Sequence, residues 1–324
     1  MAAFSVKVLD RHNEKDRFVW NRFMATAPGA TIFHTPAFLS YHQDKFNEQH
    51  IGLYKSDQLF GIMPMAVSEQ NGKKMARSPY GASYGSMIFA SMPNYSASKK
   101  ITIALMEYFQ SVGIKNVILT PPPRIYYPNS CDTFIFSLLE QGFSQVNADI
   151  TSVVELTGDI ENEVFTSRAR SKISKARKAG LRIDENADIN IFWTLMDKTF
   201  AKHGTNPTHT LDEFKYLQKV LPKNIWVDLA FAGNIPVAGV GYFKINNLVN
   251  MTFYICTDPD YRDLQGASFA INHGILNSAK AGFKYFDFGT SSVNMVAREQ
   301  IFEFKEGFGA LGCFRHTFAW EDQP

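Results

Sequence analysis

A helix-to-strand pattern that occurs twice constrains the fold of this sequence more than any other feature. Residues 105–122 and 274–291 each contain an amphipathic helix pattern, then a glycine, then a short apolar strand pattern. The glycines, Gly113 and Gly282, stand where a helix C-cap needs left-handed backbone. At nearly the same offset, residues 54–67 and 231–243 both alternate around turn-forming residues, which is the pattern of a β-hairpin. The sequence therefore predicts a tandem of related modules.

We expect an α/β (α+β) fold made of two tandem modules, each a mixed sheet flanked by helices. The length of 324 residues agrees with about two domains. We place the first module at residues 1–157 and the second at 158–324, and the C-terminal strand can pack back on the first. Apolar residues spaced three and four apart mark the sides of the expected helices that face the core.

Composition and motifs exclude several classes of protein. The net charge of +2 argues against a protein that binds polyanions over its whole surface. The longest apolar stretch, residues 226–243, contains Asp228 and Pro236, so it is not expected to span a membrane. The amino terminus has no secretory signal pattern, and we expect a cytoplasmic protein. Three scattered cysteines and the lack of an HExxH motif predict neither disulfides nor a metal site.

Residues 167–182 carry the strongest local charge. No acid occurs between Glu163 and Asp184, and the basic residues surround one apolar helix face. A helix selected only for solubility normally mixes the two signs, because opposite charges four residues apart stabilise it. We interpret this helix as a surface for an anionic partner, and a solvated charged face is the alternative. The candidate substrate-binding residues are Arg168, Lys172 and Lys175.

A second candidate anion site lies where a helix is expected to begin within residues 261–276. Free backbone N–H groups at a helix N-terminus bind anions, and small residues allow a close approach. Gly266 lies in the first turn, preceded by Gln265 and Arg262. These residues form a candidate loop for an acyl donor, although small residues begin many helices that bind nothing.

Asp287 lies in a short strand pattern that ends in a polar loop, where α/β folds place residues that face a ligand. Capping of the following turn is an equally good explanation for this aspartate. The letters Asp-Phe-Gly also occur in protein kinases, but the other kinase motifs are absent. Tyr254, on the preceding strand pattern, is a further candidate polar group of a substrate cleft.

Near the carboxyl end, residues 303–310 read EFKEGFGA and place Lys305 among aromatic residues and glycines. A lysine in such a setting either extends its ammonium to water along an apolar surface or is held in place for chemistry. The residues alone favour the first explanation.

The order of these motifs resembles the FemABX-like family of tandem GNAT-fold acyltransferases, and its FemAB-like members in particular. The matching segments are FHTPAF at 33–38, YGASYG at 80–85, the basic helix, AGFKYFDFG at 281–289 and FKEGFGA at 304–310. The loop around Gln265 is a degraded copy of the pyrophosphate loop of acetyl-CoA-dependent members of the GNAT fold. The sequence also departs from members that act on peptidoglycan, which have Gln-Ser-x-x-Trp where this chain has His34 to Phe38.

The resemblance implies that an amine attacks an activated acyl group. In its best-known members the acyl group comes from aminoacyl-tRNA and the acceptor is a peptidoglycan precursor. It assigns Phe304 and Lys305 to the transfer site, and with it we favour a chemical role for Lys305. A fixed ammonium there would stabilise the tetrahedral oxyanion, an effect of ~3 kcal/mol for one such donor. Phe304 would shape the acyl pocket.

Together, the residues and the resemblance predict an N-acyltransferase that acts on an amine of a small anionic acceptor in cell-wall or polysaccharide metabolism. Acyl-CoA or aminoacyl-tRNA is the expected donor, so tRNA is a candidate partner, and no tightly bound cofactor is expected. The alternative is a module without catalytic activity that binds RNA, phosphate or a protein.

Overall fold

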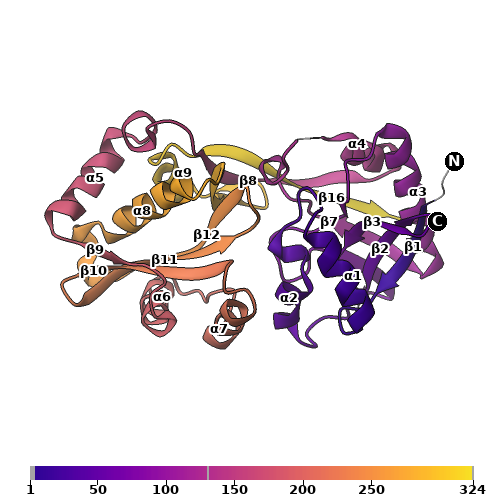
Figure 1. The fold of residues 1–324 in the computed structure, drawn as a ribbon, viewed down its shortest axis with the longest axis horizontal. Coiled ribbons are helices and arrows are strands. Elements are labelled where there is room, and N and C mark those ends of the chain that lie inside the picture. Colours follow the sequence, from indigo (N-terminus) through magenta and orange to yellow (C-terminus); the bar gives the residue numbers. More distant parts are fainter. Residues whose placement is uncertain (1–3, 130, 323–324) are drawn as a thin grey trace. The chain divides into compact units, whose positions relative to one another are not determined.

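A computed structural model describes residues 4–129 and 131–322, and the chain packs into two units (Figure 1). Unit 1 comprises the residues up to Asp149 together with those from Phe314 onwards, and unit 2 comprises Ile150–Cys313. The chain passes from one unit to the other within strand β8 (Ser144–Glu155) and returns within β16 (Leu311–Glu321). The domain boundary between residues 157 and 158 that we expect from the sequence stays a prediction.

Unit 1 contains two groups of strands with helices packed beside them. One group has the strand order β1-β2-β3-β6, and in the other β4, β5, β7 and β16 follow one another. Only β5 and β7 pair in parallel among these strands. The strands are β1 (Phe4–Leu9), β2 (His50–Lys55), β3 (Gln58–Met63), β4 (Ala66–Gln70), β5 (Lys73–Ser78), β6 (Ile88–Phe89) and β7 (Ile114–Leu119). The helices and helical turns are α1 (Glu14–Met24), η1 (Ile32–His34), α2 (Pro36–Leu39), η2 (Ser40–His42), α3 (Tyr95–Ser111), η3 (Arg124–Tyr126) and α4 (Thr133–Glu140).

Unit 2 is built on a mixed sheet with the strand order β8-β13-β12-β11-β10-β9. Helices α5 and α8 cover one face of this sheet, and α6 and α7 cover the other (Figure 1). Its further strands are β9 (Arg182–Asp184), β10 (Ile225–Ala232), β11 (Ile235–Lys244), β12 (Val249–Thr257), β13 (Tyr285–Thr290), β14 (Ser292–Val293) and β15 (Val296–Ala297). Its helices and turns are η4 (Ile160–Val164), α5 (Ser167–Lys178), α6 (Ile189–His203), α7 (Leu211–Val220), η5 (Pro259–Leu264), α8 (Gly266–Lys280) and α9 (Glu299–Glu306).

The two units share a local plan. In unit 1 the hairpin β4–β5 leads through α3 to β7, which lies parallel to β5, and in unit 2 the hairpin β11–β12 leads through α8 to β13, parallel to β12. The glycines after both helices have the left-handed backbone expected of them, with φ of 74° at Gly113 and 84° at Gly282. The predicted hairpins are also present, as β2–β3 and β10–β11. The mixed α/β fold predicted from the sequence is therefore confirmed.

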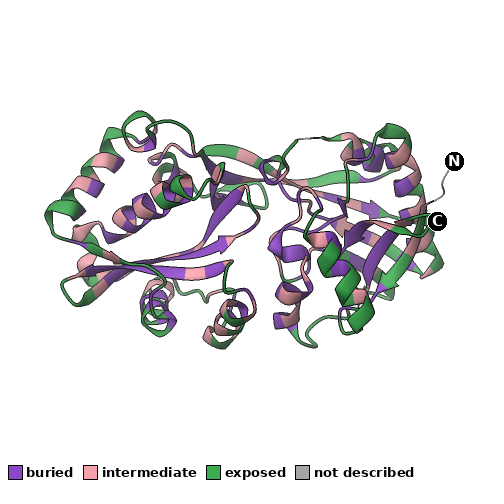
Figure 2. Ribbon diagram, viewed as in Figure 1, coloured by how far each residue is buried: buried purple, intermediate pink, exposed green. Residues whose placement is uncertain are grey.

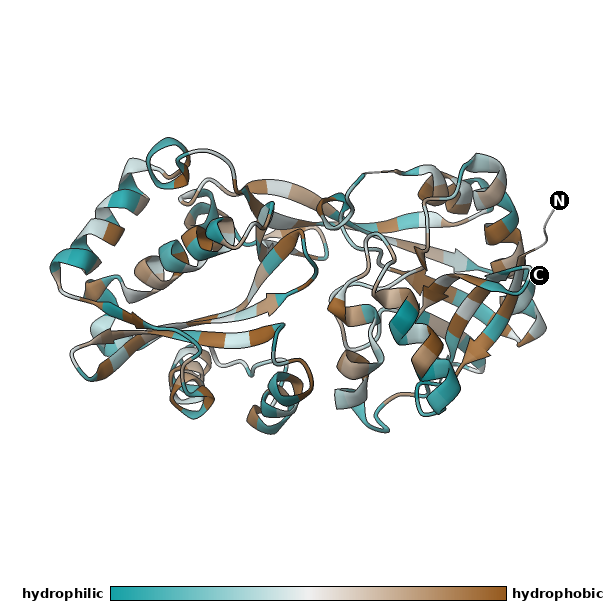
Figure 3. Ribbon diagram, viewed as in Figure 1, coloured by the Kyte–Doolittle hydropathy of each residue, from teal (hydrophilic) through white to brown (hydrophobic). Residues whose placement is uncertain are grey.

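The apolar stripes of the helices pack as their spacing predicts. In unit 2, Ile173 of α5 and Ile271 and Ile275 of α8 are buried together with residues of the central strands. Burial follows the inner sides of the helices and the strands they cover (Figure 2). In α5 only this stripe is apolar, and most of the helix is hydrophilic (Figure 3). No helix among the described residues is long and apolar enough to cross a membrane.

The histidine of the FHTPAF segment is fully buried in unit 1. Its Nδ1 lies 2.8 Å from Thr31 Oγ1, and its Nε2 lies 3.2 Å from the carbonyl oxygen of Gly85. Burial lowers the pKa of His34 from 6.5 to about 4, against the raising effect of backbone hydrogen bonds at Gly85 and Ser86. The neutral imidazole is thus part of the folded core.

We predict that His34 makes the folded state sensitive to mild acid. Below pH 6.5 the unfolded chain binds a proton at this histidine, whereas the folded chain does so only near pH 4. Stability therefore falls as pH falls between these values, by ~3 kcal/mol for this one group. Urea unfolding of wild type and His34→Asn at pH 7, 6 and 5 measures the effect. The variant should be less stable at pH 7 but lose less on acidification, and the exposed His12→Asn control should follow wild type. Equal pH slopes in all three proteins would contradict the assignment.

Candidate functional site

The side chain of Lys305 is buried at the end of helix α9, with 4% of the residue exposed. Its Nζ donates to the carbonyl oxygens of Gly289 at 2.8 Å and Thr290 at 2.7 Å. Among the described residues, the third N–H of this ammonium has no protein acceptor. The side chain also lines a cavity, so it does not extend to bulk water as the alternative explanation for this lysine requires.

Asp287 holds the end of β13, which carries those two carbonyl groups. Its Oδ1 accepts hydrogen bonds from the backbone N–H of Gly289 at 2.8 Å and from the hydroxyl of Thr151. The carboxylate is fully buried and does not line the cavities beside α9. Asp287 therefore acts on Lys305 through the backbone between them, and its charge also favours the protonated ammonium.

Burial lowers the pKa of Lys305 from 10.5 to about 8. The nearby Asp287 raises it and Arg298 lowers it, but the loss of water around the ammonium dominates. At neutral pH the side chain is therefore mostly cationic, and it titrates close to the physiological range. Titratable groups perturbed in this way are concentrated at functional sites.

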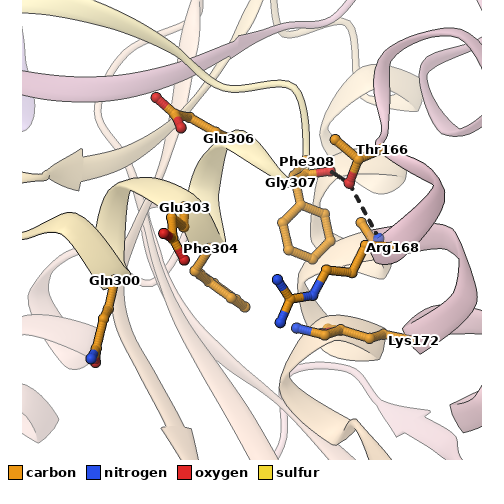
Figure 4. A pocket seen from close by; sticks show the side chains of 11 residues that line it. Thr166, Arg168, Lys172, Gln300, Glu303, Phe304, Glu306, Gly307 and Phe308 are labelled. Atoms are coloured by element: carbon orange, nitrogen blue, oxygen red, sulfur yellow. Dashed lines mark hydrogen bonds between the residues drawn. The ribbon is translucent and has the colours of Figure 1, made fainter.

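A cavity of about 520 Å³, here called the basic cavity, lies on one side of α9. Arg168 and Lys172 extend into it from α5, opposite Gln300, Glu303 and Phe304 of α9 (Figure 4). The start of α5 is tied to the end of α9, because Thr166 donates to the carbonyl oxygen of Gly307 at 3.1 Å and caps α5. The cavity is thus lined by two cations, by the carboxylates of Glu303 and Glu306, and by two aromatic rings.

A second cavity of about 480 Å³, here called the strand cavity, lies where β12 and β13 separate. These parallel strands pair only from Val249 and Tyr285 to Met251 and Asp287, although β12 continues to Thr257. The unpaired part of β12 forms one wall, and Phe288 and Thr290 of β13 form another. Lys305 lines this cavity, while Phe304 and Gln300 line both.

The other candidate residues lie in different surroundings. Arg262 lines the strand cavity, whereas Lys175 is exposed on α5 and lines neither cavity. Gln265 has left-handed backbone before α8 and donates from its side chain to the carbonyl of Arg262. A Cβ atom at Gly266 would lie 3.0 Å from the side chains of Val237 and Ala238, so this glycine permits close packing of helix on sheet.

Tyr254 points to the aromatic cluster beneath α6 and α7 and lines neither cavity. Its hydroxyl accepts a hydrogen bond from the backbone N–H of His209 at 3.1 Å and lies 2.8 Å from Nδ1 of the His209 ring. Burial raises its pKa to about 12. Its binding role, like those of Lys175, Gln265 and Gly266, stays a prediction.

Sequence reasoning missed three polar residues of α9 that line the basic cavity, Gln300, Glu303 and Glu306. They lie at a spacing of three, and Phe304 follows Glu303. The helical period over 299–306 was the signal that would have grouped them with Phe304. Two of the basic residues of α5 are instead bound to the protein itself: Arg177 pairs with Glu161 at 2.6 Å, and Arg170 donates to the carbonyl of Phe165. No cluster of three or more histidine, cysteine or acidic residues that could hold a metal occurs among the described residues.

We predict that Lys305 titrates near pH 8. The side-chain carbon resonances of labelled lysines report this titration, and comparison of wild type with Lys305→Met assigns the signal. Lys178→Met, which removes an exposed lysine of α5, is the control and should leave the signal assigned to Lys305 unchanged. A single group of lysine signals that all titrate above pH 10 would show that the Lys305 ammonium is hydrated.

Comparison with models of known protein families finds no match, and comparison with curated protein sequences finds none either. Solved structures do match over nearly the whole chain. FemX is 12% identical, with a TM-score of 0.71 over 94% of this chain and 96% of that one. The C-terminal domain of an Agrobacterium fabrum protein named as a lysylphosphatidylglycerol synthetase is 11% identical, with a TM-score of 0.61 over 96% and 92%.

A tandem GNAT protein from the clavulanic acid biosynthesis pathway is 8% identical, with a TM-score of 0.55 over 99% of both chains. At such low identity these matches concern the fold alone. The resemblance read from the sequence is confirmed at this level: the chain has the fold of FemX and of a tandem GNAT protein.

Proposed function

We propose that this protein is an acyl- or aminoacyltransferase that moves an activated acyl group onto an amine of a small anionic acceptor. The observation that carries the proposal is the buried ammonium of Lys305, which is fixed by two carbonyl oxygens and has one N–H left for a ligand in the strand cavity. The transfer would take place beside Phe304, which together with Gln300 lines both cavities.

The reaction needs a cation where negative charge develops. When the amine nitrogen attacks the acyl carbon, the carbonyl oxygen becomes an oxyanion, and the C–O or C–S bond to the donor then breaks. A hydrogen-bond donor that is already oriented, in a site shielded from water, stabilises the oxyanion without reorganising. The hydrogen bonds from Lys305 to the carbonyl oxygens of Gly289 and Thr290 supply this orientation, and Asp287 keeps the end of β13 in place.

The basic cavity is suited to the acceptor. Arg168 and Lys172 can bind phosphate or carboxylate, and a planar guanidinium does so with two parallel hydrogen bonds. The carboxylate of Glu303 lines the same cavity and can take the proton that the amine loses as it forms the new C–N bond. An acceptor that combines an anionic group with a free amine, as nucleotide-linked precursors of cell-wall or polysaccharide synthesis do, would use all three groups.

The strand cavity is suited to the donor. Beyond Met251 the edge of β12 that faces β13 has no strand partner, so an extended donor with amide groups could pair with it like an added strand. Apolar side chains such as Phe288 and Ile301 would surround the acyl group. Arg262 adds a cation at this cavity for the phosphates of acyl-CoA or of aminoacyl-tRNA.

The named neighbours support transfer of acyl groups without deciding the donor. One is named for the synthesis of lysylphosphatidylglycerol, an aminoacyl ester. Another is a tandem GNAT protein of clavulanic acid biosynthesis, in a structure without acetyl-CoA. The charge on α5 also supports the second candidate, a module that binds RNA or phosphate without catalysis.

We predict that Lys305→Ala lowers kcat about 10²–10³-fold, the usual cost of one oxyanion donor. Lys178→Ala is the matched control, because it removes an exposed lysine of α5 that lines neither cavity, and it should keep wild-type turnover. In wild type the rate should fall as pH rises through about 8, since only the protonated side chain stabilises the oxyanion. Wild-type turnover by Lys305→Ala, with circular dichroism showing intact folding, would exclude this role.

We predict that Arg168→Ala raises KM for the anionic acceptor by about tenfold or more while kcat changes less, because the guanidinium binds the acceptor in both the ground state and the transition state. The loss should shrink as salt is added, since the interaction is electrostatic. Lys178→Ala, on the exposed side of α5, is the control. An unchanged KM in Arg168→Ala would remove the acceptor from the basic cavity.

Thermal shift with acetyl-CoA, an aminoacyl-tRNA and a nucleotide-linked cell-wall precursor separates the candidate functions. Stabilisation by acetyl-CoA but not by aminoacyl-tRNA identifies a CoA donor. RNA binding that weakens steeply with salt and persists in Lys305→Ala, without turnover of any donor, would favour the module without catalysis.

A further inference from the structure

A third cavity of unit 2 lies away from α9 and shares no lining residue with the basic cavity or the strand cavity. It measures about 270 Å³ and lies between the C-terminal half of α8 and the ends of strands β10, β11 and β12. The proposed transfer reaction uses none of its residues. Its volume suits a molecule smaller than a typical drug-sized ligand.

Asp228 of β10 forms the buried part of this cavity, with only 4% of the residue exposed. Its Oδ1 accepts one hydrogen bond, from the backbone N–H of Asn186 at 3.1 Å. Among the described residues, its second carboxylate oxygen has no donor. A buried carboxylate is costly unless it is well paired, and burial raises the pKa of Asp228 to about 6. A bound donor would offset that cost.

A second buried polar side chain lies on β12, which is separated from β10 by β11. Asn250 is 2% exposed and lines the same cavity, where its Nδ2 donates to the Ser278 hydroxyl at 2.9 Å. Its Oδ1 has no hydrogen-bond partner in the described part of the chain and is covered by protein. Buried polar groups are nearly always satisfied, so the underpaired carboxylate of Asp228 indicates that a ligand with an N–H donor belongs in this cavity.

The more exposed side of the cavity carries the opposite charge. Lys223 is exposed and Lys244 is half-buried, and the ammonium of Lys244 lies over the ring of Phe283. Glu185 also lines the cavity; its Oε1 accepts from Asn277 at 2.9 Å and lies 2.8 Å from Nε2 of His273. The two lysines are therefore the cations available to an anionic group of a ligand.

We propose that this cavity is a binding site for a free amino acid. Its ammonium group would donate to Asp228, and its carboxylate would accept from Lys223 and Lys244. A zwitterion satisfies both ends at once, whereas a simple amine leaves the lysines unpaired and a carboxylic acid leaves Asp228 unpaired. The site is independent of the proposed transfer reaction, because it rests on different residues.

Isothermal titration of the full chain with free L-alanine, L-glutamine and L-lysine tests the proposal. Butylamine has the amine without the carboxylate, and N-acetyl-L-alanine has the carboxylate without the free amine. At least one amino acid should bind, and both analogues should bind at least tenfold more weakly. Failure of all three amino acids to bind, or equal binding of butylamine, would overturn the proposal.

Asp228→Asn assigns the binding to this cavity. The amide keeps the shape of the side chain and can still accept from Asn186, so the variant should fold and show unchanged or higher thermal stability. It should nevertheless lose amino-acid binding at least tenfold, and Lys244→Met should weaken binding of the amino acid but not of butylamine. Asp184→Asn, which neutralises a nearby exposed acid, and Arg168→Ala should both bind as wild type does. Normal binding by a folded Asp228→Asn protein would place the amino acid elsewhere and contradict the proposal.

Discussion

The hydrogen bonds from Lys305 to the carbonyl oxygens of Gly289 and Thr290 organise the central part of unit 2. They join the end of α9 to the last residues of β13, and Asp287 accepts a hydrogen bond from the backbone N–H of Gly289 in the same segment. An ammonium buried in this way has lost its hydration, which is why its pKa lies near 8 rather than 10.5. The free-energy cost of burying the ammonium is offset because the surrounding backbone supplies hydrogen-bond acceptors in fixed positions.

This arrangement depends on the separation of two parallel strands. If β13 paired with β12 along its whole length, the strand cavity would be closed by main-chain hydrogen bonds. Instead the pairing ends at Met251 and Asp287, and Gly289 then turns the chain with a φ of 73°. Left-handed backbone of this kind is cheap for glycine and costly for other residues. The same turn brings two carbonyl oxygens to Lys305, so the opening and the cation are produced together.

The sequence predicted the elements better than it predicted their partners. Helical stripes, glycine caps and hairpin turns are local patterns, and they identified α5, α8 and the strands around them. The sequence also singled out Lys305 and Asp287. It did not predict that Lys305 contacts the backbone held by Asp287, because that contact depends on where β13 ends. In α5 the charge pattern was informative as a whole, yet only three-dimensional packing separates Arg168 and Lys172 in a cavity from Arg177, which is bound to Glu161.

Helix α8 shows how a single packing constraint can support more than one site. A Cβ atom at Gly266 would crowd Val237 and Ala238, and one at Gly274 would lie 2.2 Å from the hydroxyl of Tyr242. Both glycines therefore let the helix lie close to β11. Other residues of α8 line cavities: Ser268 lines the basic cavity, and Asn277 lines the cavity that contains Asp228. Because a helix is stiff, a shift of α8 relative to the sheet at one glycine would alter both cavities together.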